Sequence, residues 1–453
     1  MTPAAQIAAA IEILSLIEDG EGPADDVAAL YFRRRRYIGA KDRAEIAGQL
    51  YAVLRHRAAL DWWIGRVGKG AVPQAARARV LVQLVLIAGW APERLAEACN
   101  GGRFRPAPLG PPEARLIRGL AGHTLHHPEM PRAARNDVPE WLLPPLERAF
   151  GAALEDEIRG LNGPAPVDLR VNPLKGDREE ARRRLAAEGV AAAPTPLSPL
   201  GLRLKARAPL SALAAFKEGL VEVQDEASQV AACLADARPG MRVVDFCAGA
   251  GGKTLALAAL MRNRGRLVAC DVSARRLERA ALRLRRAGID NVERRVIARE
   301  HDPWVKHHKE SFDRVFVDAP CLGTGTWRRN PDAKWRARPQ DLAELTARQR
   351  DILRSAARLV RPGGRLLYAT CSLLCEEDED QAEAFLAAMP DFSLLPAAEV
   401  WGETIGGVIP GGGRYLRLSP ARHGTDGFFA AIFARCNRKT SPDTIPDDRR
   451  GAG

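Results

Sequence analysis

The feature that most constrains the fold is a glycine-rich turn between a short apolar strand and a helical stretch, at residues 242–254. The apolar run Val243–Phe246 predicts a buried strand, and the Ala- and Leu-rich residues after Thr254 predict a helix. Between them lies Cys-Ala-Gly-Ala-Gly-Gly-Lys, whose glycines let a ligand lie against bare backbone. This order of elements favours a nucleotide-like ligand on a doubly wound sheet.

Spacing excludes two common phosphate-binding motifs at this turn. A nucleoside-triphosphate loop requires glycine five residues before its Gly-Lys pair, where Cys247 stands, and the glycines do not fit G-x-G-x-x-G either. The next predicted strand ends in Asp271, an acid placed to bind ribose hydroxyls. An ordinary α/β turn with an exposed acid is the alternative at this point.

The 453 residues divide into three predicted domains and a tail. Residues 1–140 show helical spacing of apolar residues throughout, which predicts an all-α domain. Residues 141–220 place one helix between strand-like runs and predict a small α+β module. Residues 221–436 alternate strands and helices, which predicts a mainly parallel, doubly wound (Rossmann-like) α/β sheet. The polar residues 437–453 are predicted to be a disordered tail.

The predicted strands of the third domain bring several motifs to one edge of the sheet. In an open α/β sheet, ligands gather at the carboxyl ends of the strands. A final apolar run at 428–434 could close the sheet. The strands are expected at residues 242–246, 266–272, 292–297, 314–318 and 365–371.

The charge balance favours an anionic partner. Lys and Arg number 68 against 56 Asp and Glu, a formal net charge of +12, which suits nucleic acid. Arg33–Arg36, flanked by Phe32 and Tyr37, form a basic stretch in the helical segment. This stretch is either solvated helix surface or a patch that contacts phosphates. We therefore expect the helical domain to contact RNA.

The eight cysteines are scattered and include no Cys-x-x-Cys pair, so neither a zinc site nor a disulfide framework is expected. Free thiols favour a reducing compartment, and the expected location is the cytoplasm. The N-terminus shows no signal peptide, and the longest dense apolar stretch, 80–88, is too short for a bilayer. No membrane and no metal are expected as partners.

Two predicted strand ends each carry a thiol. Asp318-Ala319-Pro320-Cys321 follows the fourth strand, and Cys371 ends the fifth. A lone buried cysteine is usually a small hydrophobe, but two thiols and a carboxylate near a ligand turn favour chemistry. Methylation of a pyrimidine at C5 needs such groups: a thiolate that adds to C6, an acid near N3 and a group that assists release.

The motifs DFCAGAGGKT, ACD, DAPCLGTG and YATCS, in this order, resemble those of the Sun-type RNA cytosine-5 methyltransferases. QDEASQ at 224–229 and HGTDGFF at 423–429 match the same family, and the resemblance covers residues 165–436. It implies S-adenosylmethionine as cofactor and RNA as substrate. A helical domain in front resembles the NusB fold and is similar to the bacterial B-type members, which modify 16S ribosomal RNA.

The resemblance implies catalytic roles for three residues. Cys371 is expected to be the nucleophile that adds to C6, Cys321 to help release the product, and Asp318 to contact the base. DNA cytosine-5 methyltransferases use the cysteine of a Pro-Cys pair as nucleophile, which would be Cys321. The residues alone leave both assignments open, and the family resemblance favours Cys371.

The resemblance also implies a cofactor site, with two departures from the family pattern. Ala250 stands where the family has proline, which should loosen the turn slightly. The aspartate that holds adenine after the third strand is absent from Ile297-Ala298-Arg299-Glu300, where Glu300 is the candidate substitute. The expected cofactor-binding residues are Cys247, Ala248, Gly249, Ala250, Gly251, Gly252, Lys253, Asp271, Glu300 and Asp318.

The target base must leave any helix to reach the thiols, so single-stranded or loop RNA is expected. Trp327, Arg328, Arg329 and Trp335 mix aromatic and basic groups suited to gripping such RNA, with core packing of a tryptophan as the alternative. Two rival functions are a tRNA cytosine-5 methyltransferase and an RNA-binding assembly factor without activity.

Overall fold

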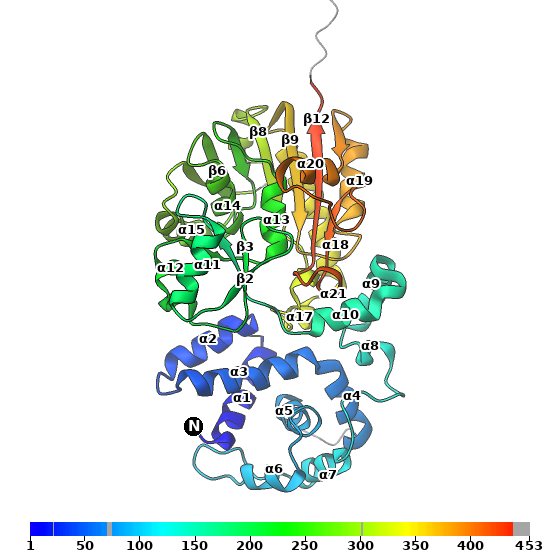
Figure 1. The fold of residues 1–453 in the computed structure, drawn as a ribbon. Coiled ribbons are helices and arrows are strands. Elements are labelled where there is room, and N and C mark those ends of the chain that lie inside the picture. The colour runs from blue at the N-terminus through cyan, green and yellow to red at the C-terminus, as the bar shows by residue number, and fades with distance from the viewer. Residues whose placement is uncertain (21, 70–74, 300–301, 438–453) are drawn as a thin grey trace, which may run out of the picture.

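The computed structural model describes residues 1–20, 22–69, 75–299 and 302–437. Glu300 and nearly all of the predicted tail therefore lie outside the described residues. A helical region, a small module with its own sheet and a large α/β domain follow one another along the chain (Figure 1). This arrangement confirms the predicted fold class. No helix in the described part of the chain combines the length and apolar composition needed to cross a bilayer.

The helices α1 to α7 share one apolar core, whereas α9 and α10 pack in another together with Trp327, Leu373 and Leu374. Thr2 caps the first helix, since its hydroxyl accepts a hydrogen bond from the Ala5 amide, and Pro3 occupies the first helical position. The helix at 75–86 is buried along most of its length and lies at the centre of the first core. The helices are α1 Pro3–Glu18, α2 Ala24–Arg34, α3 Ala40–Arg55, α4 Arg57–Gly68, α5 Ala75–Leu86, α6 Pro92–Ala98, α7 Pro111–Leu120, α8 Arg132–Arg135, η1 Glu140–Leu142, α9 Leu143–Phe150, η2 Gly151–Ala153 and α10 Leu154–Asn162.

The small module is an antiparallel four-stranded sheet in the order β2-β3-β1-β4. Its helix α11 begins at the N-cap Asp177, whose carboxylate accepts a hydrogen bond from the Glu180 amide. Leu169, Val171 and Leu185 form part of a separate apolar core. The elements are β1 Asp168–Val171, α11 Arg178–Ala187, β2 Ala192–Pro194, β3 Gly201–Leu204, η3 Leu210–Ala212, α12 Ala214–Lys217 and β4 Val221–Val223.

The α/β domain is built on an eight-stranded sheet in the order β10-β12-β9-β8-β5-β6-β7, with β11 paired to β12. Two apolar cores, one on each face of the sheet, bury the strands from both sides. The strands are β5 Arg242–Asp245, β6 Arg266–Asp271, β7 Val292–Val296, β8 Phe312–Asp318, β9 Val360–Thr370, β10 Phe392–Leu395, β11 Leu416–Leu418 and β12 Phe428–Arg435. The helices are α13 Glu226–Leu234, α14 Gly252–Leu260, α15 Ala274–Ala287, α16 Pro303–His307, η4 Thr324–Thr326, α17 Ala333–Arg336, α18 Pro339–Ala357, α19 Glu379–Ala388, α20 Ala397–Thr404 and α21 Pro420–His423.

The strands β7, β6, β5, β8 and β9 are parallel, as the sequence predicts, and their carboxyl ends meet at one edge. The final run 428–434 does not close the sheet. It forms β12, which is antiparallel to β9 on one side and to β10 on the other. The unpredicted strand β10 occupies the edge instead, because Phe392 and its neighbours pair with residues 432–435.

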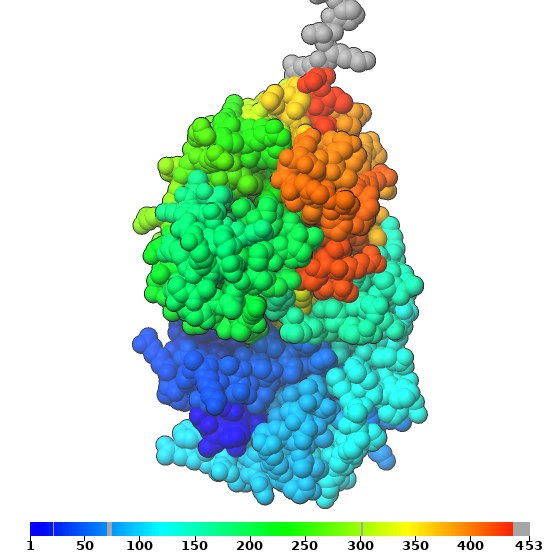
Figure 2. Space-filling view, viewed as in Figure 1, coloured from blue at the N-terminus to red at the C-terminus, as the bar shows by residue number. Residues whose placement is uncertain are grey.

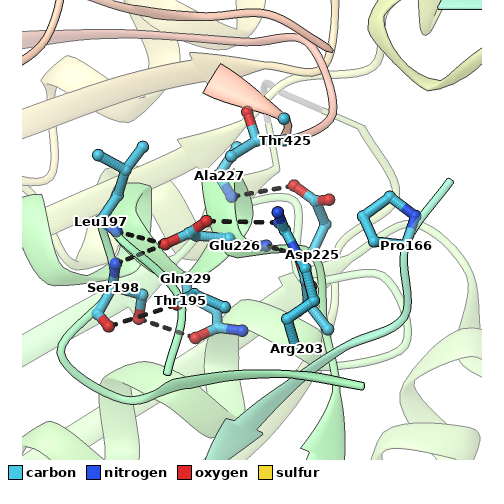
Figure 3. A network of polar contacts seen from close by, with 12 residues as sticks. Pro166, Thr195, Leu197, Ser198, Arg203, Asp225, Glu226, Ala227, Gln229 and Thr425 are labelled. Atoms are coloured by element: carbon cyan, nitrogen blue, oxygen red, sulfur yellow. Dashed lines mark hydrogen bonds and ion pairs between the residues drawn. The ribbon is translucent and has the colours of Figure 1, made fainter. Parts of the chain in front are cut away.

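Buried ion pairs join the small module to the α/β domain (Figure 3). The carboxylate of Glu226, at the start of α13, accepts hydrogen bonds from the amides of Leu197 and Ser198 and lies 3.5 Å from Arg203. Arg203 also makes a bidentate pair with Asp168 at 2.7 and 2.9 Å. Because Glu226 and Asp168 are fully buried, each charge needs these partners, and the contacts of Glu226 hold the module against the start of α13.

The helical region packs directly against both other parts (Figure 2). Arg55 donates to the carbonyls of Asn162 and Arg328, and Asp332 accepts from the Ala24 amide. The buried Nζ of Lys334 donates to Arg55 O at 3.0 Å and to Asn162 Oδ1 at 2.8 Å. The segment that follows Cys321 is therefore held between the helical region and the sheet.

Candidate active site

The two predicted thiols meet at the carboxyl end of the sheet. The strands β8 and β9 are neighbours in register, with Asp318 opposite Ala369. Cys371 follows β9 directly and Cys321 follows β8 after a Pro-containing turn. Their Sγ atoms lie 3.5 Å apart and form a hydrogen bond. The pairing of the strands thus brings together two sulfurs that are 50 residues apart in the chain.

A lysine from the glycine turn joins this pair. Lys253, in the first turn of α14, makes an ion pair with Asp318 at 2.6 Å. Burial lowers the pKa of the Lys253 ammonium, but the negative charge of Asp318 outweighs burial, and Cys371 contributes in the same direction, so the pKa lies above its ordinary value. Lys253 is therefore a cation whose charge acts on the Cys371 sulfur.

Cys321 is held in its protonated form. The hydrogen bond with Cys371 raises the pKa of the Cys321 thiol well above its ordinary value, and burial and the charge of Glu377 act in the same direction. The S–H group of Cys321 can thus donate to the sulfur of Cys371. The two sulfurs are chemically distinct: one lies beside a cation and the other retains a proton.

The loop that carries Cys321 is anchored by buried side chains that sequence reasoning missed. Glu377 is fully buried, and its carboxylate accepts from the Leu322 amide and from Gln349 Nε2, both at 3.0 Å. Gln349 also donates to the Pro320 carbonyl at 2.9 Å. The residues before and after Cys321 are therefore both hydrogen-bonded to the Glu377–Gln349 pair. The available signal was the acidic run after Cys371, which sequence reasoning did not single out.

A cavity of about 440 Å³ joins the thiols to the glycine turn. Asp271 is buried, and its carboxylate accepts from the Gly249 amide at 2.8 Å and from the Ser273 amide at 2.8 Å. The volume lies within the range of small-molecule sites, roughly 300–1,000 Å³. The lining residues are Phe246, Cys247, Gly249, Asp271, Val272, Arg276, Ile297, Asp318, Ala319, Pro320, Cys321, Arg348, Ile352 and Cys371.

This cavity fits a nucleoside-type cofactor. A buried acid at the end of the second parallel strand faces bare backbone at Gly249, and Phe246, Ile297 and Ile352 supply apolar walls. Next to it, Asp245 is fully buried, its Oδ1 has no hydrogen-bond partner, and burial raises the pKa of its carboxyl group to about 7. A buried polar atom of this kind marks the turn as a place built for function.

Not every predicted cofactor residue lines the cavity. Four of them line it, namely Cys247, Gly249, Asp271 and Asp318. The other described residues contact neighbouring elements and do not face the cavity. The Ala250 carbonyl accepts from Arg283 and the Gly252 carbonyl accepts from Arg170, so both point towards neighbouring elements. Ala248 is buried, Gly251 packs against Ala280, and Lys253 reaches Asp318. Glu300 lies outside the described residues.

Of the four residues predicted to grip RNA after Cys321, Trp327 and Arg328 are buried. Trp327 is 1% exposed and belongs to an apolar core, the alternative that the sequence left open. Arg328 and Arg329 both make ion pairs with Asp225 and Asp426, so carboxylates already neutralise them. Sequence spacing could not show these acids, which come from distant segments. Trp335 remains half-buried at the boundary with the helical region.

The fold and the cavity define an S-adenosylmethionine-dependent methyltransferase. The crystal structure of PH0851 is similar, with a TM-score of 0.76 and 30% identity over 96% of this chain and 99% of that chain. A methyltransferase homologue from Pyrococcus horikoshii matches with a TM-score of 0.57 and 29% identity, over 67% of this chain and 97% of its own.

Sequence comparison gives the family. Residues 232–434 match the family model described as 16S rRNA methyltransferase RsmB/F, and residues 138–211 match its ferredoxin-like domain. The ribosomal RNA small subunit methyltransferase B of Erwinia tasmaniensis is 31% identical over 93% of this chain and 96% of that protein. Its counterpart in Klebsiella pneumoniae strain 342 is 32% identical over 85% and 90%. The chain belongs to the RsmB/F family of methyltransferases.

Proposed function

We propose that the protein methylates C5 of a cytosine in 16S ribosomal RNA through a covalent bond between Cys371 and C6. The observation that supports this most directly is the pair of sulfurs 3.5 Å apart, one beside Lys253, in the cavity that also holds Asp271. The names of the relatives in Erwinia and Klebsiella support the choice of small-subunit RNA.

Cys371 acts first in this proposal. Its thiolate, stabilised by the Lys253 cation, adds to C6 of the cytosine, and the electron pair of the C5–C6 bond moves into the ring towards N3. The Asp318–Lys253 ion pair would hydrogen-bond the ring edge and supply a proton there. C5 then has the electron density of an enamine carbon. A positioned acid of this kind typically contributes roughly 10²–10⁴-fold to the rate.

The glycine turn and Asp271 would hold S-adenosylmethionine, which supplies the methyl group to C5. The acid would accept hydrogen bonds from the ribose hydroxyls, and the bare backbone at Gly249 would contact the cofactor closely. Phe246, Ile297 and Ile352 would cover the apolar part of the bound molecule and exclude water from it.

Cys321 acts last. Once the Cys371 sulfur is bonded to carbon, it is a weaker hydrogen-bond acceptor and carries no charge, so both effects by which Cys371 raises the pKa of Cys321 diminish. Cys321 then releases its proton to water and, as a thiolate, removes the proton from C5. The electron pair of that C–H bond reforms the C5–C6 double bond, Cys371 leaves as a thiolate, and the proton at N3 returns to the Asp318–Lys253 pair.

Substitution of each cysteine tests the roles. We expect Cys371→Ala to abolish methylation and to form no RNA adduct, and Cys321→Ala to accumulate a covalent RNA–protein adduct on a denaturing gel. Cys375→Ala, four residues beyond the nucleophile and half-buried, is the matched control and should methylate at the wild-type rate. The reverse pattern, with adducts in Cys371→Ala, would contradict the assignment.

The RNA substrate has its own test. Mapping of 5-methylcytosine in total RNA from cells with and without the gene should show one or more sites lost from 16S ribosomal RNA. Loss from tRNA instead would favour the tRNA enzyme. The aspartate that the family places after the third strand is absent here, so binding of S-adenosylmethionine by the purified protein separates an enzyme from an inactive assembly factor.

We also propose a cytoplasmic location. All eight cysteines are free thiols in the structure. Two of them must remain reduced for the chemistry above, and a reducing compartment provides this.

A further inference from the structure

A second cavity lies where the helical region meets the methyltransferase domain. Its volume is about 740 Å³, and it shares no lining residue with the catalytic cavity. Three stretches that are far apart in sequence form its walls: the start of α4, residues 131–143 and the region of α17 (Figure 1). The cavity therefore exists only where the domains come together.

Two half-buried tryptophans line this cavity, Trp141 and Trp335. The ring of Trp335 is held in place, because its Nε1–H donates to the Leu54 carbonyl at 2.6 Å. Its neighbour Lys334 is buried and lies 5.1 Å from the ring centroid. A fixed aromatic ring loses little entropy when a planar ligand stacks on it. Such rings are the usual platforms for unpaired bases in RNA-binding proteins.

Cationic side chains accompany the aromatic rings. Arg57 lines the cavity with its guanidinium 5.7 Å from the Trp335 ring centroid, and Arg132 lines it from the 131–143 stretch. Of the two carboxylates in the lining, Asp61 pairs more closely with Arg79, at 2.6 Å, than with Arg57, at 3.8 Å, and Glu140 is exposed to solvent. Arg132 makes an ion pair with Glu147 at the surface, where both side chains remain more than 40% exposed and a phosphate can compete for the arginine. The combination of planar rings and arginines suits a base and its phosphate.

We infer that this cavity binds an unpaired nucleotide of the RNA substrate, one other than the cytosine that reacts. The base would stack against Trp335 and Trp141, and the phosphate would lie at Arg57 and Arg132. The inference rests on the proposed RNA methylation for the identity of the RNA. The site itself is separate from the thiols and binds without chemistry.

Binding to the cavity is tested with adenosine monophosphate as the probe. The full chain is labelled with 5-fluorotryptophan and saturated with S-adenosylhomocysteine to fill the cofactor cavity. We expect the ¹⁹F resonances of Trp141 and Trp335, assigned by substitution with Phe, to shift as the nucleotide is added. The resonances of Trp63 and Trp327, each 1% exposed, should not move. No shift at Trp141 and Trp335, or a shift only at Trp304 near the cofactor cavity, would overturn the inference.

The contribution to RNA binding is tested with the double variant Arg57→Ala/Arg132→Ala. We expect the KM for RNA to rise about tenfold, in line with the loss of two phosphate contacts, while kcat stays within about twofold. The double variant Arg115→Ala/Arg118→Ala removes the same charge from exposed positions of α7 and should leave the KM unchanged. Equal effects of the two double variants would show a general charge effect and overturn the inference.

A third variant tests the aromatic ring separately from the arginines, with its folding checked by urea denaturation. Trp141→Ala leaves the arginines and the Trp335 contacts intact, and stacking on one ring predicts a loss of RNA affinity of about tenfold. An affinity equal to wild type would contradict the inference. If the wild-type protein methylates no RNA, the proposed function fails, whereas the nucleotide titration still reports on the cavity.

Discussion

The two active-site sulfurs share one hydrogen bond, so the protonation of each depends on the other. The bond to Cys371 is the largest cause that raises the pKa of Cys321, and burial is the second. Removal of the Cys371 sulfur should therefore lower the pKa of Cys321, although burial keeps it above its ordinary value. We expect Cys321 in the Cys371→Ala variant to be alkylated by iodoacetamide at lower pH than in wild type.

Mass spectrometry of the Cys321 peptide after alkylation across a pH series measures this shift. Cys375→Ala provides the comparison, since it removes a neighbouring thiol without touching the pair. An alkylation curve that stays in place or moves to higher pH would show that the hydrogen bond does not control the thiol.

Glu377 is a positioning residue for the same thiol. Glu377→Gln removes the charge that helps to raise the pKa of Cys321 and weakens the hold on the Leu322 amide. A hydrogen bond to a charged group contributes roughly 1.5–3 kcal/mol, so we expect kcat to fall about tenfold or more with the KM for S-adenosylmethionine unchanged. The pH profile of kcat should also shift to lower pH.

The neighbouring substitution Glu376→Gln is the matched control for this prediction. Glu376 makes only an outer ion pair with Arg148 at 3.3 Å, and its variant should keep the wild-type rate and pH profile. If both variants lose activity equally, the acidic run acts as a whole and Glu377 has no special part.

Residues with a distinctive motif were predictable, and residues defined by packing were not. Cys371, Cys321 and Asp318 follow strands whose order a sequence pattern reveals, and they line one cavity. Glu377 and Gln349 act through contacts with a loop, and the acidic run around Glu377 does not reveal which of its members makes them. A tryptophan such as Trp327 is a residue type suited to RNA contact. Its burial depends on helices from elsewhere in the chain, which the local sequence does not show.

At the scale of elements, the turn between β5 and α14 depends on one glycine. Gly251 has a φ of 82°, and a Cβ there would lie 2.8 Å from the Cβ of Ala280 on α15. Gly251→Ala should therefore lower the free energy of unfolding by about 1–3 kcal/mol and displace the backbone that faces the cofactor. We expect the affinity for S-adenosylmethionine to fall at least about tenfold, since the turn loses its preformed shape.

Calorimetric titration of the cofactor and urea denaturation check this prediction. Gly252→Ala is the control, because its Cβ would meet no atom closer than 3.9 Å and its φ lies outside the left-handed region. If the two variants lose equal stability and equal cofactor affinity, the cause is the loss of glycine flexibility and not the contact with α15.

The parallel part of the sheet was predictable from apolar runs, and its antiparallel edge was not. The strands β5, β6, β7 and β8 lie within a few residues of the expected ranges. The strand β9 begins at Val360, ahead of the expected position, in a stretch interrupted by proline and glycine that obscures the pattern. The place of β12 between β9 and β10 is set by long-range pairing, which an apolar run alone does not specify.

At the scale of the whole molecule, the helical region and the catalytic domain are joined through the segment after Cys321. Trp335 donates to Leu54 O, Lys334 to Arg55 O, and Asp332 accepts from the Ala24 amide. The sequence predicted a helical domain that contacts RNA. It did not predict that this domain would hydrogen-bond to the segment after Cys321. Contacts between residues nearly 300 positions apart leave no local signal.

Lys334 gives this interface a dependence on pH. It is fully buried, and burial lowers the pKa of its amine to about 7. A neutral amine has two N–H groups, and both have acceptors, Arg55 O and Asn162 Oδ1. The folded protein thus favours the neutral amine, whereas the unfolded chain keeps the ammonium up to a pH near 10.4. Between these values the unfolded state binds more protons, so stability rises with pH.

We therefore expect the free energy of unfolding of the wild-type protein to increase between pH 7 and pH 9 relative to that of Lys334→Met, by roughly 2–3 kcal/mol. Urea denaturation followed by tryptophan fluorescence at several pH values measures the difference. Lys205→Met, at an exposed position of the small module, should track the wild type across the series. Parallel curves for wild type and Lys334→Met would mean that Lys334 stays charged, and the interface would then hold a buried cation on two neutral oxygens and the ring of Trp335.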